Sequence, residues 1–131
     1  ILYSESIYPT VGKMRILIVE DELLIQQSLK ILLENMGMSV ATTTHGKEAI
    51  KMIQQENFDR IICDLMLQDI TGFDVLEESL KKYDRNEIKS KFVIMSAYNS
   101  PEIIEKANSY QCLFISKPFQ HIQDTLKLMI K

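Results

Sequence analysis

The chain has 131 residues, of which 46% are hydrophobic and 25% are charged, and this composition is typical of one globular domain with its own core. Its net charge of −3 argues against a nucleic-acid-binding surface, which normally needs a basic face. Its apolar stretches are all shorter than the ~18 residues that a membrane-spanning helix needs. The two cysteines, Cys63 and Cys112, lie in apolar stretches without metal-site spacing, so we expect buried thiols and a cytoplasmic location.

The first predicted elements follow a short leader. Residues 1–13 lack a charged segment followed by an apolar core, so they do not predict a signal peptide. We interpret them as a leader, either an added segment or the end of a larger protein, ahead of a domain that spans residues 14–131. Residues 14–20, MRILIVE, predict a strand buried on both faces. Residues 21–37 then have apolar positions at helical spacing and end at Gly37, which predicts an amphipathic helix.

The same alternation continues to the end of the chain. Four further strands are predicted, at residues 38–43, 58–64, 91–97 and 112–116. Helices are predicted between and after them, at residues 45–53 with Thr44 as N-cap, 72–83, 100–109 and 119–131. The helix at 100–109 has the clearest start, because Ser100 is a good N-cap and Pro101 suits the first helical position. Residues 84–90 are polar and predict a turn-like connection.

Five β-α units with short connections predict an α/β doubly wound fold. Such alternation places a parallel sheet between two layers of helices, as a three-layer sandwich. Ligands of these sheets bind in the crevice beyond the carboxyl ends of the strands. The residues that end each predicted strand are therefore the first candidates for a functional site.

Four of the five strand ends carry side chains suited to one kind of chemistry. Glu20 and Asp21 follow the first strand, Asp64 ends the third, and Ser96 and Lys117 stand at the ends of the fourth and fifth. Neighbouring carboxylates repel one another, and a Mg²⁺ ion relieves that repulsion. An Asp carboxylate can attack phosphorus as a nucleophile, while a metal ion and a lysine neutralise the transferred phosphoryl group. We therefore predict phosphoryl transfer to Asp64, assisted by Lys117 and by the Ser96 hydroxyl.

At this point the sequence resembles the receiver domains of response regulators in two-component signalling. The resemblance covers residues 14–131 and is carried by four motifs in order: ILIVEDE (16–22), DLMLQDITG (64–72), FVIMSA (92–97) and FISKPF (114–119). Each motif alone is weak, but their order and spacing together are specific. The resemblance implies a flavodoxin-like fold, with five helices around a five-stranded parallel sheet of order 2-1-3-4-5.

The resemblance also implies a role for each site residue. Asp64 would be the phosphoacceptor. The metal ion, Mg²⁺ or Mn²⁺, would be held by Glu20, Asp21, Asp64 and the backbone carbonyl of Met66. Ser96 and Phe114 would be the switch pair that responds to the phosphoryl group. Lys117 would contact the phosphoryl oxygens, and the Lys117–Pro118 bond would be cis.

The expected partners and output follow from the same resemblance. A sensor histidine kinase or a histidine phosphotransfer protein would donate the phosphoryl group, and an effector domain or protein would receive the signal, with no direct contact to nucleic acid or membrane. The responsive face would comprise residues 100–109, 112–116 and 119–130, which serves partner docking or a weak homodimer in the family. Such a protein catalyses its own phosphorylation and dephosphorylation but is not a turnover enzyme.

Several positions depart from the family pattern. Gln68 replaces a usual proline, which predicts a more mobile loop, and Tyr110-Gln111 replaces a usual Gly-Ala before the fifth strand. Phe114 lacks the hydroxyl of the tyrosine often found there. Met66 and Tyr98 would flank the path of the attacking water, so we predict slow loss of the phosphoryl group.

Three other functions compete with this one. A pseudo-receiver, which keeps the fold as a binding module without phosphorylation, stays an alternative. A phosphatase of the haloacid dehalogenase type needs a second Asp where this chain has Met66. A nucleotide-binding protein needs a phosphate-cradling glycine loop after the first strand, where this chain has EDELL. His45 and His121 have no partner at catalytic spacing, so we expect them at the surface.

Overall fold

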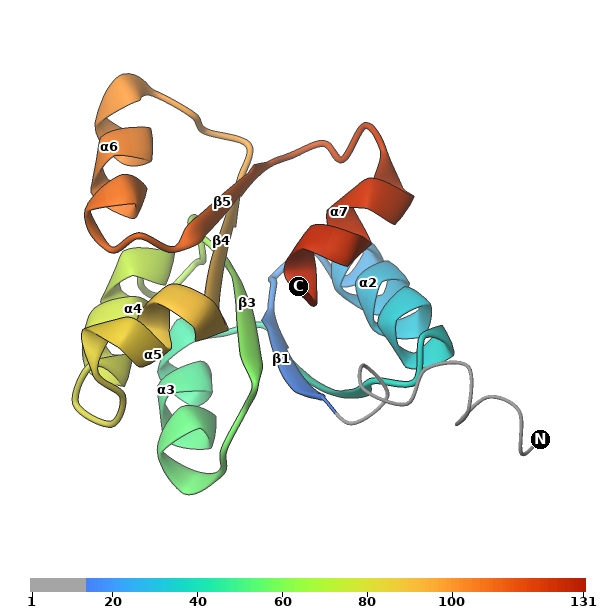
Figure 1. Cartoon of the computed structure of the whole chain (residues 1–131), viewed down its shortest axis with the longest axis horizontal. Helices are drawn as coiled ribbons and strands as arrows, with labels where there is room; N and C mark the ends of the chain where they lie inside the picture. Colours follow the sequence, from blue (N-terminus) through green and yellow to red (C-terminus); the bar gives the residue numbers. More distant parts are fainter. Residues whose placement is uncertain (1–13) are drawn as a thin grey trace.

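The computed structural model describes residues 14–131 as a parallel sheet between two layers of helices (Figure 1). The strands are β1 (Arg15–Val19), β2 (Ser39–Thr43), β3 (Arg60–Asp64), β4 (Phe92–Ser96) and β5 (Leu113–Ser116). Their spatial order is β2-β1-β3-β4-β5, with every pair parallel, so the predicted sheet is confirmed. The helices are α2 (Leu23–Asn35), α3 (Gly46–Gln55), α4 (Gly72–Ser79), α5 (Arg85–Lys91), α6 (Pro101–Ser109) and α7 (Ile122–Met129). The expected leader lies outside the described residues.

Two separate apolar clusters hold the layers to the sheet. Alternate residues of each central strand point to opposite faces, so Ile16 and Ile18 belong to one cluster and Leu17 and Val19 to the other. The first cluster joins the sheet to α2 and α7, and the second joins it to α3, α4, α5 and α6. Figure 1 shows these two groups of helices on opposite sides of the sheet. The central residues of β1, β3 and β4 form continuous apolar runs, because these strands are buried on both faces of the sheet.

One sequence expectation is wrong: residues 84–90 are not a turn-like connection, because α5 occupies them. The described residues therefore hold six helices where the resemblance implied five. Asp84 and Glu87 form a capping box, in which each side chain accepts a hydrogen bond from the backbone N–H of the other residue, at 2.9 Å and 3.1 Å. Ile88 of α5 is buried in the apolar cluster on the α3/α4/α6 side of the sheet. Lys89 and Lys91 lie in the last turn, where their positive charges interact favourably with the helix dipole.

Two helix starts also differ from expectation. The N-cap of α3 is His45 rather than Thr44, and its side chain makes no capping hydrogen bond. The last helix begins at Ile122 rather than at 119, because Phe119 belongs to the connection and packs against the α2/α7 cluster. The predicted start of α6 is confirmed, since Ser100 accepts a hydrogen bond from Ile103 N–H and Pro101 is the first helical residue.

The topology brings the carboxyl ends of the strands to one edge of the sheet. Val19 is paired with Cys63, Asp64 with Met95, and Ser96 with Ser116. The residues that end β1, β3, β4 and β5 are therefore neighbours, although they are far apart in the sequence. Among residues 14–131, each helix is too short or too polar to cross a membrane.

Candidate functional site

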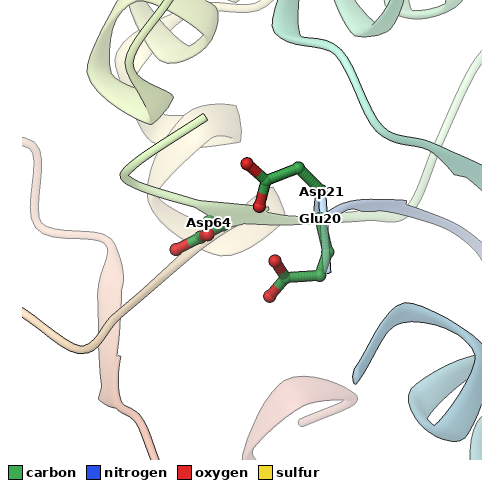
Figure 2. Close-up of side chains that lie close together, drawn as sticks. All are labelled: Glu20, Asp21 and Asp64. Carbon is green, nitrogen blue, oxygen red and sulfur yellow. The ribbon is translucent and has the colours of Figure 1, made fainter. Parts of the chain in front are cut away.

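Three carboxylates meet at the ends of β1 and β3 (Figure 2). Glu20 and Asp21 follow β1, and Asp64 is the last residue of β3. One oxygen from each lies within 4.8 Å of the others. Three hard oxygen donors at this spacing, two of them buried, match the ligands that Mg²⁺ takes in proteins. The donor set therefore fits the metal that the sequence predicts.

Glu20 is the most buried member of this cluster. Its side chain is fully inaccessible, and burial raises the pKa of its carboxyl from 4.5 to about 7. Lys117 donates a hydrogen bond to Oε1 at 2.8 Å, and the backbone N–H of Glu22 donates to Oε2 at 3.1 Å. These donors act against the effect of burial. Gln26 of α2 donates to the Glu20 carbonyl at 3.0 Å, which fixes the end of β1.

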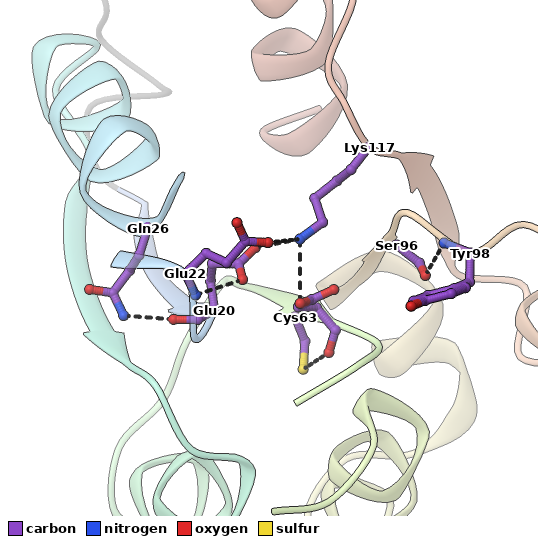
Figure 3. A network of polar contacts seen from close by, with 8 residues as sticks. Glu20, Glu22, Gln26, Cys63, Ser96, Tyr98 and Lys117 are labelled. Atoms are coloured by element: carbon purple, nitrogen blue, oxygen red, sulfur yellow. Dashed lines mark hydrogen bonds and ion pairs between the residues drawn. The ribbon is translucent and has the colours of Figure 1, made fainter. Parts of the chain in front are cut away.

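Lys117 brings a positive charge into the acidic cluster from the end of β5. Its ammonium lies 2.8 Å from Glu20 Oε1, 3.3 Å from Asp64 Oδ2 and 3.9 Å from Glu22 Oε1, and only 8% of the side chain is exposed. Figure 3 shows this side chain pointing toward Glu20 and Glu22. Burial lowers the pKa of Lys117, but the bond to Glu20 and the charge of Asp64 outweigh it, so the net shift is upward. The Lys117–Pro118 bond is cis, as the resemblance implies.

Asp64, the predicted phosphoacceptor, is the last residue of β3 and lies at the carboxyl edge of the sheet. Its side chain is 6% exposed, and burial raises the pKa of its carboxyl against the opposing effect of Lys117. The backbone N–H of Met66 also helps to keep it ionised. A carboxylate so placed is held in one position by the end of the strand, as a nucleophile requires.

Ser96 is the last residue of β4, and Phe114 lies in the neighbouring strand β5. Ser96 is fully buried, and its hydroxyl oxygen accepts a hydrogen bond from the backbone N–H of Tyr98 at 2.9 Å (Figure 3). Phe114 lies in β5, where it is partly buried against the cluster under α3, α4 and α6. Within residues 14–131, no hydrogen bond joins the Ser96 hydroxyl to the carboxylates or to Lys117, so the site consists of a tight four-residue centre with Ser96 on the neighbouring strand.

The segment from the end of β3 to the first residue of α4 contains two residues that the sequence reasoning missed. Gly72 passes so close to the strand that a Cβ there would meet the Asp64 carbonyl oxygen at 2.7 Å. The Asp69 carboxylate accepts hydrogen bonds from the backbone N–H groups of Gly46 and Lys47, both at 2.9 Å. The motif DITG holds both residues, but the partners of Asp69 are 22 and 23 residues away and no local pattern points to them. The predicted mobility of this loop, from Gln68, stays a prediction.

The turn before β5 has its own attachment to the fold. Tyr110 donates a hydrogen bond to the Glu77 carboxylate on α4, and its ring stacks on Phe73 with ring centres 6.1 Å apart. The Arg85 guanidinium lies 5.6 Å from the centre of the Tyr110 ring. Burial and the bond to Glu77 raise the pKa of Tyr110 to about 12. The next residue, Gln111, stands where the family usually has alanine and takes the left-handed backbone conformation with φ 59°, whereas Tyr110, at the position of the usual glycine, has φ −89°.

The remaining sequence predictions concern surface and core. His45 and His121 are exposed, and Cys63 and Cys112 are buried without a disulfide, as predicted. On α6, Ile103 packs against the core, whereas Ile104 is 37% exposed.

Comparisons with known proteins agree with this geometry. A family model described as the response regulator receiver domain matches residues 16–130. The transcriptional regulatory protein QseB of Escherichia coli O157:H7 is 31% identical over 116 residues, which are 88% of this chain and 51% of that protein. The cell cycle response regulator CtrA of Brucella ovis is 32% identical over 83 residues, which are 63% of this chain and 34% of that protein. The chain thus spans about half the length of QseB and a smaller share of CtrA.

Solved structures show the same similarity. The non-phosphorylated receiver domain of HemR from Leptospira biflexa aligns with a TM-score of 0.77 and 30% identity, covering 87% of this chain and 89% of that one. The receiver domain of the Francisella response regulator 1452 aligns with a TM-score of 0.75 and 26% identity, covering 88% and 93%. The response regulator TrrA from Thermotoga maritima, solved in complex with Mg²⁺ and BeF, aligns with a TM-score of 0.71 and 28% identity, covering 88% and 98%.

Proposed function

This chain belongs to the response regulator receiver domain family, and on that premise we propose that it is a switch set by phosphorylation of Asp64. The phosphoryl group would come from the phosphohistidine of a sensor histidine kinase or of a histidine phosphotransfer protein. The observation that carries the proposal is the convergence of Glu20, Asp21, Asp64 and Lys117 at one edge of the sheet. The complex of the similar response regulator TrrA with Mg²⁺ and BeF supports the same chemistry here.

Each residue of the site has a distinct part in this chemistry. Asp21, Asp64 and the Met66 carbonyl would hold the metal, with Glu20 bound mostly through water. When bound, Mg²⁺ supplies positive charge that screens the carboxylates and the oxygens of the incoming phosphoryl group. The Asp64 carboxylate attacks phosphorus, and the histidine nitrogen of the donor leaves. Lys117 lies within ion-pair distance of both Glu20 and Asp64, so its ammonium can follow the new negative charge.

The output would arise from a change of hydrogen-bond partner at Ser96. Its hydroxyl now accepts from Tyr98 N–H, and a phosphoryl group on Asp64 offers acceptor oxygens that the hydroxyl can donate to. If Ser96 moves toward the phosphoryl group, Phe114 on the adjacent strand can move inward to fill the space. The affected face would comprise α6, β5 and α7, which would dock an effector or a second copy of the domain. In this role the protein catalyses its own modification and is not a turnover enzyme.

The experiment that tests this proposal is a small-phosphodonor assay read by intact mass. The protein is incubated with acetyl phosphate and Mg²⁺, beside Asp64→Asn and a sample with excess EDTA. We expect one added phosphoryl group that requires both Asp64 and the metal. An Asn side chain has nearly the same shape but is not a nucleophile toward phosphorus, so this variant separates chemistry from folding.

The same assay distinguishes the pseudo-receiver alternative. If neither acetyl phosphate nor phosphoramidate adds mass to the folded wild-type protein, phosphorylation is not its function and a protein-binding role replaces it. An adduct that survives in Asp64→Asn would instead mean that another residue is the acceptor. The full set of carboxylates with Lys117 favours the receiver function over that alternative.

A further inference from the structure

We infer that Asp69 is a positioning residue for the metal site, because it fastens the loop that carries Met66 to the start of α3. The inference rests on the proposed function, since it assigns the Met66 carbonyl to the metal. Asp69 itself touches neither Asp64 nor the site of the phosphoryl group in this role. It acts through the path of the backbone between Asp64 and Thr71.

Both carboxylate oxygens of Asp69 contact α3, whose first residues lie 22 and 23 positions earlier in the sequence. Oδ1 accepts a hydrogen bond from Gly46 N–H and Oδ2 accepts one from Lys47 N–H, both at 2.9 Å. These N–H groups belong to the first turn of α3, where the free amides and the helix dipole favour a negative charge. Although partial burial opposes it, the donation from these amides lowers the pKa of Asp69, so the carboxylate is the form that makes the contact.

The start of α3 is not capped by its own N-cap residue. His45 occupies that position, and its side chain makes no capping hydrogen bond. The helix therefore takes its cap from a different loop. Side chains of that loop also pack closely against the start of α3, because a Cβ on Gly46 would overlap Cγ1 of Ile70 and lie 3.2 Å from Cδ1 of Leu67. Loop and helix are thus packed together as well as hydrogen-bonded.

The rest of the loop is tied mainly to its own neighbours. Gly72 N–H donates to the Leu65 carbonyl at 2.8 Å, and Met66 forms an isolated bridge with Thr71. These bonds close the loop on itself, and Leu65 N–H anchors its first residue to β4 through the Met95 carbonyl at 2.8 Å. Among its side chains, Gln68 and Met66 are exposed. Asp69 is the side chain that adds hydrogen bonds between the far part of the loop and a separate element, next to the apolar contacts of Leu67 and Ile70.

Two backbone groups of Met66 depend on the position of this loop. Its N–H helps to keep the Asp64 carboxyl ionised, and its carbonyl is the proposed metal ligand. Groups that orient a metal ligand from outside the coordination shell contribute strongly to affinity. Asp69 would do so here by holding the loop. It directly follows Gln68, which stands where the family usually has a proline.

The test compares Asp69→Ala with Asp84→Ala by Mg²⁺ titration without any phosphodonor. Asp84 is the N-cap of α5 and accepts a backbone hydrogen bond of 2.9 Å, so its loss removes a cap of the same kind. Because α5 precedes β4, it stands at the amino end of that strand, whereas the metal site stands at the carboxyl ends. Binding is followed by calorimetry and by amide NMR shifts, and thermal unfolding shows that both variants fold.

We expect Asp69→Ala to raise the Mg²⁺ dissociation constant by about tenfold, while Asp84→Ala leaves it at the wild-type value. Asp69→Asn keeps one acceptor oxygen, so its constant should fall between those of Asp69→Ala and the wild type. In the acetyl phosphate assay, Asp69→Ala should need more Mg²⁺ for half-maximal rate, with a smaller change in the rate at saturating metal. A purely structural role would not give this separation.

Failure of the inference and failure of the proposed function have different signatures. If wild type binds Mg²⁺ and is phosphorylated but Asp69→Ala binds the metal equally well, the inference is wrong and the proposed function stands. If Asp84→Ala weakens binding as much as Asp69→Ala, the effect is general destabilisation and the inference is again wrong. If folded wild type neither binds Mg²⁺ nor takes up a phosphoryl group, it is the proposed function that fails.

Discussion

The Lys117 ammonium lies 2.8 Å from Oε1 of Glu20, although 97 residues separate them in the sequence. Both side chains are almost completely buried, so neither charge would be stable there without the other. The pair brings the end of β5 against the end of β1 across the intervening Asp64. It therefore places a positive charge in the acidic cluster, where the proposed function needs one beside Asp64.

Replacing Lys117 with Met should separate metal binding from phosphoryl transfer. Without the ammonium, the repulsion among the three carboxylates is no longer partly neutralised. Mg²⁺ binding, which relieves that repulsion, should therefore be retained or strengthened. Phosphorylation by acetyl phosphate at saturating Mg²⁺ should fall by about 100-fold, because a fixed positive charge at the transferred group is lost. Lys81→Met, at an exposed ion pair on the surface, serves as the control. Phosphorylation of Lys117→Met at the wild-type rate would contradict the role given to this lysine.

The stability of the metal-free protein should depend on pH through Glu20. Its pKa is raised from 4.5 to about 7 in the folded state, so the folded state binds the proton more tightly than the unfolded chain. The resulting stabilisation is complete below pH 4.5 and is lost as the pH rises through about 7. The loss should be at most about 3 kcal/mol, measured by urea unfolding in EDTA between pH 5 and pH 8.

Two controls belong to the pH experiment. Glu20→Gln should flatten the slope, because the amide does not titrate. Saturating Mg²⁺ should also flatten it, because the metal stabilises the ionised carboxylates of the folded state. Equal slopes for wild type and Glu20→Gln would show that another group is responsible.

The phosphorylated state should be long-lived because of Met66 and Tyr98. Their side chains are 48% and 59% exposed, and they follow Asp64 and Ser96 by two residues each. Changing both, as Met66→Asn with Tyr98→Glu, should speed loss of the phosphoryl group by about tenfold, equivalent to ~1.4 kcal/mol in the barrier. The rate is measured by intact mass after removal of acetyl phosphate. An unchanged rate would refute this interpretation, and Ile104→Asn on α6 controls for the loss of an exposed apolar side chain.

Gly72→Ala should disturb Asp64 directly. The added Cβ would lie 2.7 Å from the Asp64 carbonyl oxygen and 3.0 Å from Leu65 Cα, and backbone atoms cannot yield as a side chain can. We expect a loss of about 1–3 kcal/mol in the free energy of unfolding, together with slower phosphorylation. Ser79→Ala, in the same helix, is the control, because its hydroxyl bonds only to the Val75 carbonyl. A Gly72→Ala protein as stable as wild type would mean that the loop relaxes without cost.

Tyr110→Phe tests the attachment of the turn before β5. The change removes the hydrogen bond to Glu77 but keeps the ring that stacks on Phe73. The free energy of unfolding should fall by about 1 kcal/mol. Tyr83→Phe is a matched control with a weaker bond, 3.4 Å to Asn57 Oδ1, and should cost less. Equal costs for the two variants would show that the bond to Glu77 contributes nothing particular.

The candidate site could be predicted because its residues end the strands of a parallel sheet. Alternation of apolar runs and helical patterns predicts that sheet, and parallel strands have their carboxyl ends at one edge. The sequence alone therefore predicts Glu20, Asp64 and Lys117 as neighbours, and the distances confirm it. Their burial, which raises the pKa of Glu20, depends on the packing of the whole domain and has no local signal.

The missed features have different causes. Residues 84–87, DRNE, contain a capping box, but Ile88 is the only apolar residue of α5 and gives no helical period to recognise. Asp69 forms its two bonds with a helix more than 20 residues earlier, so only the tertiary structure shows it. Gly72 looks like an ordinary helix start, and its close approach to Asp64 is visible only from the backbone path.

The ion pair of Lys117 with Glu20 has a consequence for synthesis on the ribosome. The acidic half of the site lies in residues 20–64, whereas its cation comes from residue 117. A nascent chain that has emerged only as far as β4 holds all three carboxylates without the ammonium. Under the proposed function, competence to receive a phosphoryl group would therefore arise late, when β5 docks beside β4 and brings Lys117 to Glu20 and Asp64.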